Sequence, residues 1–96
     1  MKKRVGRIFT KNLANFLYSQ GNTDEALEHY DKALVINPED WDAHYKLGGI
    51  LIKQEKINEA LSHFAEVIRI NPDYAPAYNE IGRNYTGHKG KIAKIQ

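Results

Sequence analysis

The 96-residue sequence predicts an all-α fold, a helix–turn–helix repeat solenoid of five helices in a right-handed superhelical stack. Two observations lead to this prediction. The tripeptide Ile-Asn-Pro stands at residues 36–38 and again at residues 70–72, an offset of 34 residues that a wider set of residues also keeps. Apolar side chains recur at spacings of three and four, which is the period of one buried helical face. Units of this size bury their apolar faces only against their neighbours, so we expect one continuous stack.

The repeat offset divides the chain, residues 1–96, into the parts of a single domain. Residues 7–40 form the first repeat and residues 41–74 form the second. Residues 75–86 are expected to form one further helix that caps the stack, and residues 87–96 a basic tail.

The first repeat begins with a helix at residues 8–20. Its predicted buried stripe consists of Phe9, Leu13, Phe16, Leu17 and Tyr18. Gly21 ends this helix, because glycine readily adopts the left-handed conformation of a helix C-terminus. Asn22 and Glu25 have the spacing of a capping box and begin the second helix. That helix ends before Pro38, since the residue that precedes a proline is driven out of helical geometry.

The second repeat follows the same plan with one substituted turn. Residues 42–54 repeat the apolar pattern, with Asp40 as the expected N-cap of the third helix and Asp73 as that of the fifth. Pro72 ends the fourth helix in the way that a proline ends the second. Glu55 and Lys56 stand where the first repeat has Gly21 and Asn22, so the second repeat lacks the glycine that marks this turn.

One repeat position carries a small residue in every copy, namely Ala14, Gly48 and Gly82. A small residue lets the first helix of a pair approach its partner closely, while Tyr30 and Phe64 fill the space beside the contact. Gly82 is placed to receive a sixth helix, which these 96 residues do not encode.

With these residues in place, the chain resembles the tetratricopeptide repeat family over residues 7–96. The matching residues are Leu13, Ala14, Ala26, Tyr30, Ala33, Pro38, Leu47, Gly48, Ala60, Phe64, Pro72, Tyr78, Ile81, Gly82 and Tyr85. Thr10 and His44 depart from the family pattern, which has a large apolar residue there. The resemblance implies a protein interaction module whose first helices line a concave groove for an extended or helical segment of a partner protein.

Carrying the family groove over by position gives a set of candidate peptide-binding residues. They are Lys11, Asn12, Asn15, Tyr18, Tyr45, Lys46, Gly49, Ile52, Lys53, Asn79 and Arg83, with Glu80 among them on the fifth helix. The Lys and Arg side chains of this set outnumber Glu80 and Asp42, so the groove is expected to be mildly positive. We therefore expect a protein or peptide partner that is acidic or of mixed charge.

One branch of the family holds the C-terminal carboxylate of cytosolic heat-shock chaperones with two Asn and three basic residues. Lys11 and Asn15 match two of these places. Lys46, Pro76 and Glu80 occupy the other three. Because Glu80 would repel a carboxylate, the sequence predicts that this clamp is not formed.

The same sequence carries no motif for catalysis, for a cofactor or for a metal. It contains no cysteine, which excludes disulfides and cysteine-ligated zinc. His29 and His63 are repeat equivalents, which indicates structural roles, and no stretch approaches the ~20 apolar residues of a membrane helix. Nucleic-acid binding is disfavoured by the acidic middle of the chain and by the lack of a known reading motif. We expect a cytoplasmic protein that is not an enzyme, with no cofactor, no metal and no membrane contact.

The basic ends of the chain leave several hypotheses open. Residues 1–11 carry five Lys or Arg and no acid, while residues 12–86 carry all twelve acidic residues. The apolar residues of the tail are Ile92, Ala93 and Ile95. This tail could be frayed, fold over the uncovered edge near Gly82, or pair with a second copy in a homodimer through residues 75–96. The alternative functions are a regulatory or targeting fragment of a larger enzyme and a self-assembling repeat module.

Overall fold

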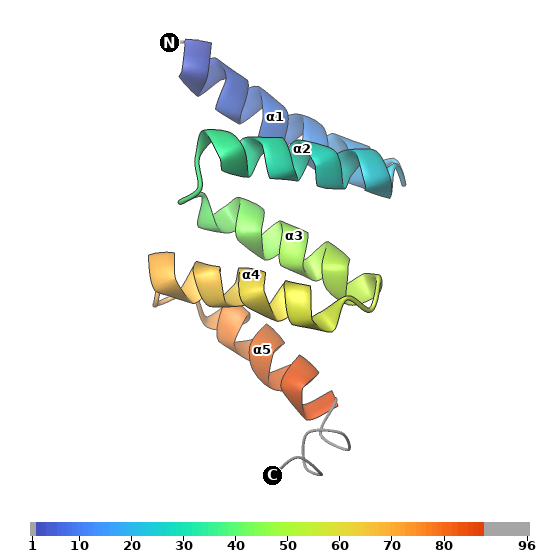
Figure 1. The fold of residues 1–96 in the computed structure, drawn as a ribbon, viewed down its shortest axis with the longest axis vertical. Helices are drawn as coiled ribbons and strands as arrows, with labels where there is room; N and C mark the ends of the chain where they lie inside the picture. Colours follow the sequence, from blue (N-terminus) through green and yellow to red (C-terminus); the bar gives the residue numbers. More distant parts are fainter. Residues whose placement is uncertain (1, 88–96) are drawn as a thin grey trace.

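The structure is a computed structural model that describes the backbone of residues 2–87 and the side chains of residues 10–84. In this part of the chain it contains α-helices and no strand. The helices are α1 (Lys2–Ser19), α2 (Thr23–Ile36), α3 (Trp41–Lys53), α4 (Ile57–Ile70) and α5 (Ala75–Gly87). They stack in chain order along the longest axis of the molecule (Figure 1). The predicted all-α repeat solenoid is confirmed.

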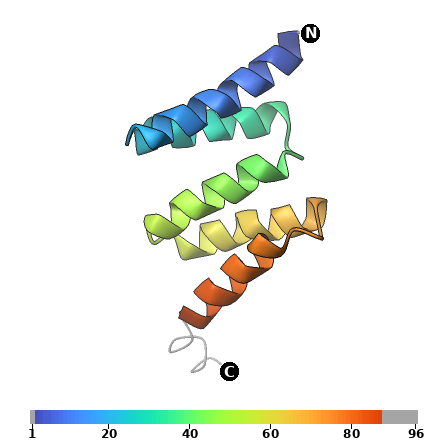
Figure 2. The same cartoon turned by 180° about the vertical axis from the view of Figure 1, so that it is seen from behind.

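The stack has two layers. Helices α2 and α4 lie nearer to the viewer in Figure 1, and α1, α3 and α5 lie nearer in Figure 2, where they run in a similar diagonal direction. The first helices of the repeats therefore share one side of the molecule. This arrangement positions the candidate groove residues, which come from α1, α3 and α5.

The ends of the stack differ in part from the prediction. Helix α1 begins at Lys2 and not near residue 8, because the intervening Lys and Arg residues are good helix formers. Helix α5 reaches Gly87, one residue beyond the predicted end of the cap. The remainder of the predicted basic tail, residues 88–96, lies outside the described residues, and so do the side chains of Phe9 and Tyr85.

Both turns within the repeats place one residue in the left-handed conformation. Gly21 has a φ angle of 85° and Glu55, its repeat equivalent, has 63°. The next residue in each turn, Asn22 or Lys56, donates its backbone N–H to the carbonyl five residues earlier, at 2.8 and 2.9 Å. This six-residue closure is the Schellman motif. A non-glycine residue in this conformation costs about 1–2 kcal/mol, so Glu55 is strained where Gly21 is not.

The predicted N-caps have mixed outcomes. Asp40 accepts a hydrogen bond from the N–H of Ala43 at 3.2 Å and caps α3 as expected. The predicted capping box at Asn22 is wrong, since Asn22 closes the turn after α1 and its side chain makes no cap bond to α2. The prediction for Asp73 is also wrong, because α5 begins at Ala75 and the offset of 34 places Tyr74 at the position of Asp40.

The core is built on two buried rings beside small residues. Tyr30 and Phe64 have exposed fractions of 1% and 0%. A Cβ atom built on Gly48 would lie 2.8 Å from Cε1 of Phe64, so the close approach that the sequence predicts does occur in the second repeat. The same atom on Gly82 would meet nothing within 4 Å, because no helix covers this part of α5 in the described structure.

The prediction that Phe16 belongs to the buried stripe is wrong. Phe16 is 59% exposed, whereas its repeat equivalent Ile50 is 3% exposed. Helix α3 packs against α2 of the preceding repeat, but within the described residues no repeat precedes α1. In a solenoid, burial at this position depends on a neighbour and not on the residue itself.

Candidate protein-binding groove

A groove of about 510 Å³ opens on the side of the molecule that α1, α3 and α5 share. All five helices contribute to its lining, and α3 contributes most. The lining residues are Asn15, Tyr18, Tyr30, Tyr45, Lys46, Gly49, Ile50, Lys53, Phe64 and Glu80. The volume lies within the ~300–1,000 Å³ that proteins use to enclose compact ligands.

The groove brings together part of the set that the repeat positions predicted. The predicted residues in the lining are Asn15, Tyr18, Tyr45, Lys46, Gly49 and Lys53, together with Glu80. The predicted residues outside the lining are Lys11, Asn12, Ile52, Asn79 and Arg83. These five residues lie on α1, α3 or α5 as expected, but they are not part of the groove wall, and Ile52 packs against the core. Whether the set binds a peptide stays a prediction.

Sequence reasoning missed three lining residues, Tyr30, Ile50 and Phe64. It assigned them to the core, and they are indeed buried, yet they also reach the groove from below. The signal that indicates this dual role is the pair Gly48-Gly49. Gly48 lets α3 pack closely on the ring of Phe64, and Gly49 adds no side chain to the groove wall beside it.

Gly49 shapes the middle of the groove. An added Cβ atom at Gly49 would meet nothing within 4 Å, and the repeat equivalents are the longer residues Asn15 and Arg83. Tyr45 lies one helical turn before Gly49 and Lys53 one turn after it, on the same helix face. A glycine inside a helix costs about 0.5–1 kcal/mol relative to alanine. We call the open space over Gly49, between Tyr45 and Lys53, the Gly49 hole.

Aromatic contacts fix the side chains at both ends of the Gly49 hole. The ring of Tyr45 lies 5.6 Å from that of Phe64 and 5.1 Å from that of Tyr74, the second contact being perpendicular. At the other end, Nζ of Lys53 lies 5.6 Å from the ring centre of Tyr18. Edge-to-face and cation–π contacts of this kind restrain rings that would otherwise have to be ordered on binding.

The hydroxyl group of Tyr30 donates a hydrogen bond to Oδ1 of Asn15 at the edge of the groove. Burial raises the pKa of Tyr30 to about 12, and the charges of Asp42 and Tyr18 add to the shift. Tyr30 therefore stays protonated and remains a donor at neutral pH. The Asn15 amide nitrogen is a donor, and Oδ1 has a second lone pair with which it can accept another hydrogen bond.

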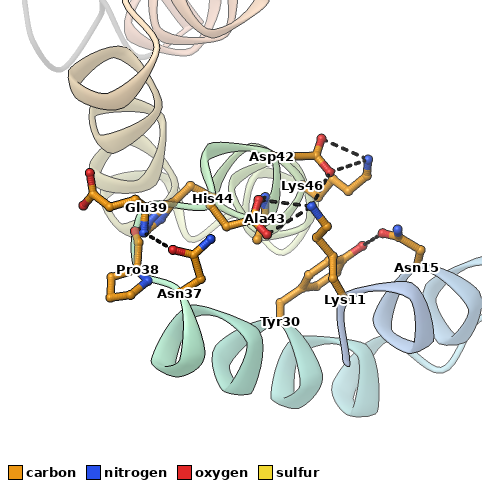
Figure 3. A network of polar contacts seen from close by, with 11 residues as sticks. Lys11, Asn15, Tyr30, Asn37, Pro38, Glu39, Asp42, Ala43, His44 and Lys46 are labelled. Carbon is orange, nitrogen blue, oxygen red and sulfur yellow. Dashed lines mark hydrogen bonds and ion pairs between the residues drawn. The ribbon is translucent and has the colours of Figure 1, made fainter. Parts of the chain in front are cut away.

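Two of the predicted groove cations are held by carboxylates (Figure 3). Nζ of Lys11 lies 3.0 Å from Asp40 and 3.4 Å from Asp42, and Nζ of Lys46 lies 3.2 Å from Asp42. Lys11 thus links α1 to the residue that caps α3. The expected positive surface is weaker than predicted, because the expectation did not count Asp40 and treated these lysines as unpaired.

The remaining charges give the groove two unlike ends. Arg83 lies 3.4 Å from Glu80. Burial raises the pKa of Tyr45, the negative charge of Glu80 raises it further, and the positive charge of Arg83 lowers it. Among the predicted groove cations, Lys53 alone makes no ion pair with a carboxylate within the described residues. The negative Glu80 therefore lies near Tyr45, and the unpaired positive charge lies at the Lys53 end.

A histidine pair lies in the second repeat, apart from the groove. Nε2 of His44 lies 2.9 Å from the carbonyl of Pro38, and Nδ1 of His44 lies 3.0 Å from Nδ1 of His63 (Figure 3 shows His44 and Pro38). A carbonyl only accepts, so Nε2 of neutral His44 carries the proton and its Nδ1 accepts from His63. Burial and the neighbouring His44 lower the pKa of His63, while Asp31, Glu59 and Glu66 oppose this shift.

The described part of the chain contains neither a metal site nor a membrane-spanning helix. No group of three or more His, Cys, Asp or Glu side chains there has the arrangement of a metal site. No helix there has both the length and the apolar character to cross a membrane. The chemistry that the described residues offer is therefore that of the groove, with its aromatic side chains, one amide donor and separated charges.

The fold and the groove together define a helical repeat protein of the kind that presents a surface to other molecules. Family models agree: one described as TPR repeat matches residues 14–54, and one described as tetratricopeptide repeat matches residues 41–74. The chain belongs to the tetratricopeptide repeat family. Repeats of this family generally mediate protein–protein interactions and are generally not catalytic.

A solved structure with the same fold is that described as the crystal structure of MamA. The TM-score is 0.81 and the sequence identity is 25%, over 84% of this chain and 47% of that one. The chain thus spans about half the length of the MamA structure it matches. No curated protein sequence matches the chain significantly.

Proposed function

We propose that this chain is a non-catalytic interaction module that binds a segment of a partner protein in the groove between α1, α3 and α5. The observation that supports this most strongly is the groove itself. It is open, lined by aromatic rings that are already held in place, and formed on the side that the first helices share. A groove with ordered side chains costs less conformational entropy on binding than a mobile surface.

The groove is better suited to binding than to catalysis. Glu80 is its only carboxylate, and it is engaged by Arg83. The histidine pair lies elsewhere, so the lining contains no nucleophile beside a base. These features favour recognition, with an acidic or mixed-charge partner segment. A cytoplasmic location is part of the same proposal, and the cysteine-free sequence is compatible with it.

The test must separate the groove from the fold. Reversing the charge of Lys11 is unsuitable, because Lys11 bonds to Asp40 and Asp40 caps α3. Better changes are Tyr18→Ala and Lys53→Glu, whose side chains line the groove without an ion pair to a described carboxylate. The control is Lys32→Glu, an equal charge reversal at an exposed residue of α2 outside the lining.

A partner recovered by affinity capture is purified, and its binding is measured by isothermal titration calorimetry. Extended segments in open grooves bind with micromolar affinity, about −8 kcal/mol. Each groove variant is expected to weaken binding at least tenfold, about 1.4 kcal/mol, while Lys32→Glu leaves it unchanged. Equal binding by the wild type and both groove variants would show that the partner contacts another surface.

A second candidate function is self-assembly through residues 75–96. Two observations favour it, namely the uncovered Gly82 and the 47% exposed side chain of Tyr78 on the last helix. It predicts a mass that rises with protein concentration in sedimentation equilibrium and returns to that of one chain in the variant Tyr78→Ser. A constant single-chain mass up to millimolar concentration excludes it.

A further inference from the structure

Helix α3 contains two adjacent glycines, and only one of them is required by the packing of the fold. Gly48 is required by packing, because a Cβ atom there would lie 2.8 Å from the ring of Phe64. Gly49 has no such requirement, since nothing lies within 4 Å of the position its Cβ would take. Glycine weakens the interior of a helix relative to alanine, so α3 would be more stable with alanine at position 49. The absent side chain instead leaves the Gly49 hole open.

The Gly49 hole is confined to the middle of the groove. The equivalent positions of the neighbouring first helices carry Asn15 and Arg83, so neither α1 nor α5 has a glycine at this position. The exposed apolar surface around the hole comes from the partly buried rings of Tyr18 and Tyr45, while the other apolar lining residues, Tyr30, Ile50 and Phe64, are buried. A ligand group that enters here leaves water for an apolar, largely aromatic surface.

We propose that the groove holds its partner segment by one large apolar side chain, preferably aromatic, inserted over Gly49, with a carboxylate of the same segment placed against Lys53. This inference rests on the proposed function and names the specificity of that groove. Gly49 is its specificity-determining residue. The partner is an extended segment of another protein that carries these two groups.

The spacing between the two groups follows from helix geometry. Lys53 is four residues after Gly49, about 6 Å along the axis of α3. An extended chain covers that distance in about two residues, at ~3.3 Å per residue. The carboxylate is therefore expected two positions from the apolar side chain. The opposite end of the Gly49 hole is closed to it, because Glu80 lies there beside Tyr45.

The charge of Lys53 makes this end of the groove the favourable one. Lys46 is already paired with Asp42, whereas Lys53 is exposed and contacts only the ring of Tyr18 among the interactions found in the described residues. The chain's own residues 88–96 fit this site less well, because they carry three Lys and no acidic side chain, and their apolar residues are aliphatic. A separate partner segment fits the two requirements better.

The test uses defined peptides and the full 96-residue chain. The peptides have nine residues, blocked ends and a Ser-Gly background, with Trp, Phe, Leu or Ser at the centre and Asp or Lys two positions to either side. Binding is measured from ¹⁵N–¹H chemical shifts of the wild type and of Gly49→Leu, Lys53→Glu and Gly82→Leu. The last variant is the matched control, because Gly82 is also a helical glycine with nothing within 4 Å.

The wild type is expected to bind peptides with a central Trp or Phe more tightly than those with Leu, and far more tightly than those with Ser. At the position two residues from the centre, Asp is expected to give tighter binding than Lys. Gly49→Leu is expected to weaken binding at least tenfold while its melting temperature equals or exceeds that of the wild type. Gly82→Leu is expected to bind like the wild type, and Lys53→Glu to reverse the preference between Asp and Lys. Nuclear Overhauser effects between the central ring and the α-protons of Gly49 supply a check on the wild type alone, which does not depend on any variant folding.

Several results would overturn the proposal. If peptides or the captured partner bind Gly49→Leu as tightly as the wild type, but lose affinity in Tyr18→Ala, the groove function holds and the Gly49 hole is not the determinant. If no peptide shifts any groove resonance and the captured partner is unaffected by groove variants, the proposed function fails as well. If the resonance of Gly49 shifts with the concentration of the chain alone, a second copy fills the groove and the proposal is wrong.

Discussion

The two complete repeats have the same helix pair but differ at positions that separate fold from function. The first repeat has Gly21 in its left-handed turn position, and the second has the strained Glu55. The residue under the aromatic ring is Ala14 in the first repeat and Gly48 in the second, where the ring of Phe64 leaves no room for a Cβ atom. The fold therefore accepts different residues at equivalent positions of the two repeats.

The same comparison places the Gly49 hole in the second repeat. Asn15 of the first repeat carries a side chain that bonds to Tyr30, whereas its equivalent Gly49 leaves a space above the core. The difference between Asn15 and Gly49 therefore leaves open space on α3 at the position where α1 carries a side chain. The predictions below use this pairing of equivalent positions, each with its own control.

The largest expected effect is the loss of the buried ring in the second repeat. Phe64 is fully buried and lies over Gly48, so Phe64→Ala removes a ring that no other side chain can replace. We expect the free energy of unfolding to fall by about 3–5 kcal/mol, measured by urea denaturation. The control Phe16→Ala, at an exposed residue, is expected to change it by less than ~0.5 kcal/mol. A loss below ~1 kcal/mol in Phe64→Ala would contradict the packing described for α3 and α4.

The next effect concerns the helical glycines. Gly48→Ala places a Cβ atom against the Phe64 ring and is expected to lower the free energy of unfolding by about 1–3 kcal/mol. Gly82→Ala, at the equivalent position of α5, meets nothing and is expected to raise it by up to ~1 kcal/mol through helix propensity. Urea denaturation of the two variants measures both changes in the free energy of unfolding. Changes of the same sign would contradict the difference described between the crowded Gly48 and the open Gly82.

Acid is expected to weaken the second repeat through its histidine pair. The pKa of His63 is lowered below 6.5 in the folded state, so the unfolded chain binds protons more readily between that lowered value and 6.5. The free energy of unfolding therefore contains a contribution from neutral His63, which is fully present above pH 6.5 and is lost as the pH falls towards the lowered pKa of the folded state. Denaturation at a series of pH values is expected to show a steeper acid loss in the wild type than in His63→Gln. A wild type that gains stability from pH 7 to pH 5 relative to this variant would contradict the assignment.

The smallest effect is expected at the second turn. Glu55→Gly removes the cost of holding a residue with a side chain in the left-handed conformation, about 1–2 kcal/mol. Glycine also makes the unfolded chain more flexible, which offsets about 0.5–1 kcal/mol of this gain. The net gain is about 0.5 kcal/mol, visible as a small rise in melting temperature. The reciprocal change Gly21→Glu is expected to lower it. A Glu55→Gly variant that melts at a lower temperature than the wild type would show that this side chain makes a compensating contact.

Much of the fold could be predicted from the sequence because the repeat offset transfers information between copies. The helix pair, the cap at Asp40 and the close contact at Gly48 all follow from residue type and spacing. The exposure of Phe16 did not follow, since burial at that position depends on a preceding repeat. Asp73 was misplaced because its residue type suits an N-cap, although the offset itself points to Tyr74.

The groove could be predicted only in outline. Its residues on α1, α3 and α5 follow from the shared side of the first helices, but its underside does not. Tyr30 and Phe64 have the pattern of core residues and are buried, and no sequence pattern indicates that they also border the groove. The charge balance was also missed, since the pairing of Lys11 with Asp40 joins residues 29 positions apart, which no local pattern reveals.

The most direct test of the account is an amide chemical-shift map of the isotopically labelled chain on addition of its captured partner segment. The account predicts that the largest shifts centre on Gly49 and extend to Tyr18, Tyr45 and Lys53, and that Gly49→Leu removes them while the variant remains folded. Largest shifts on the outer surface of α2 and α4, or a map that Gly49→Leu leaves unaltered, would contradict it.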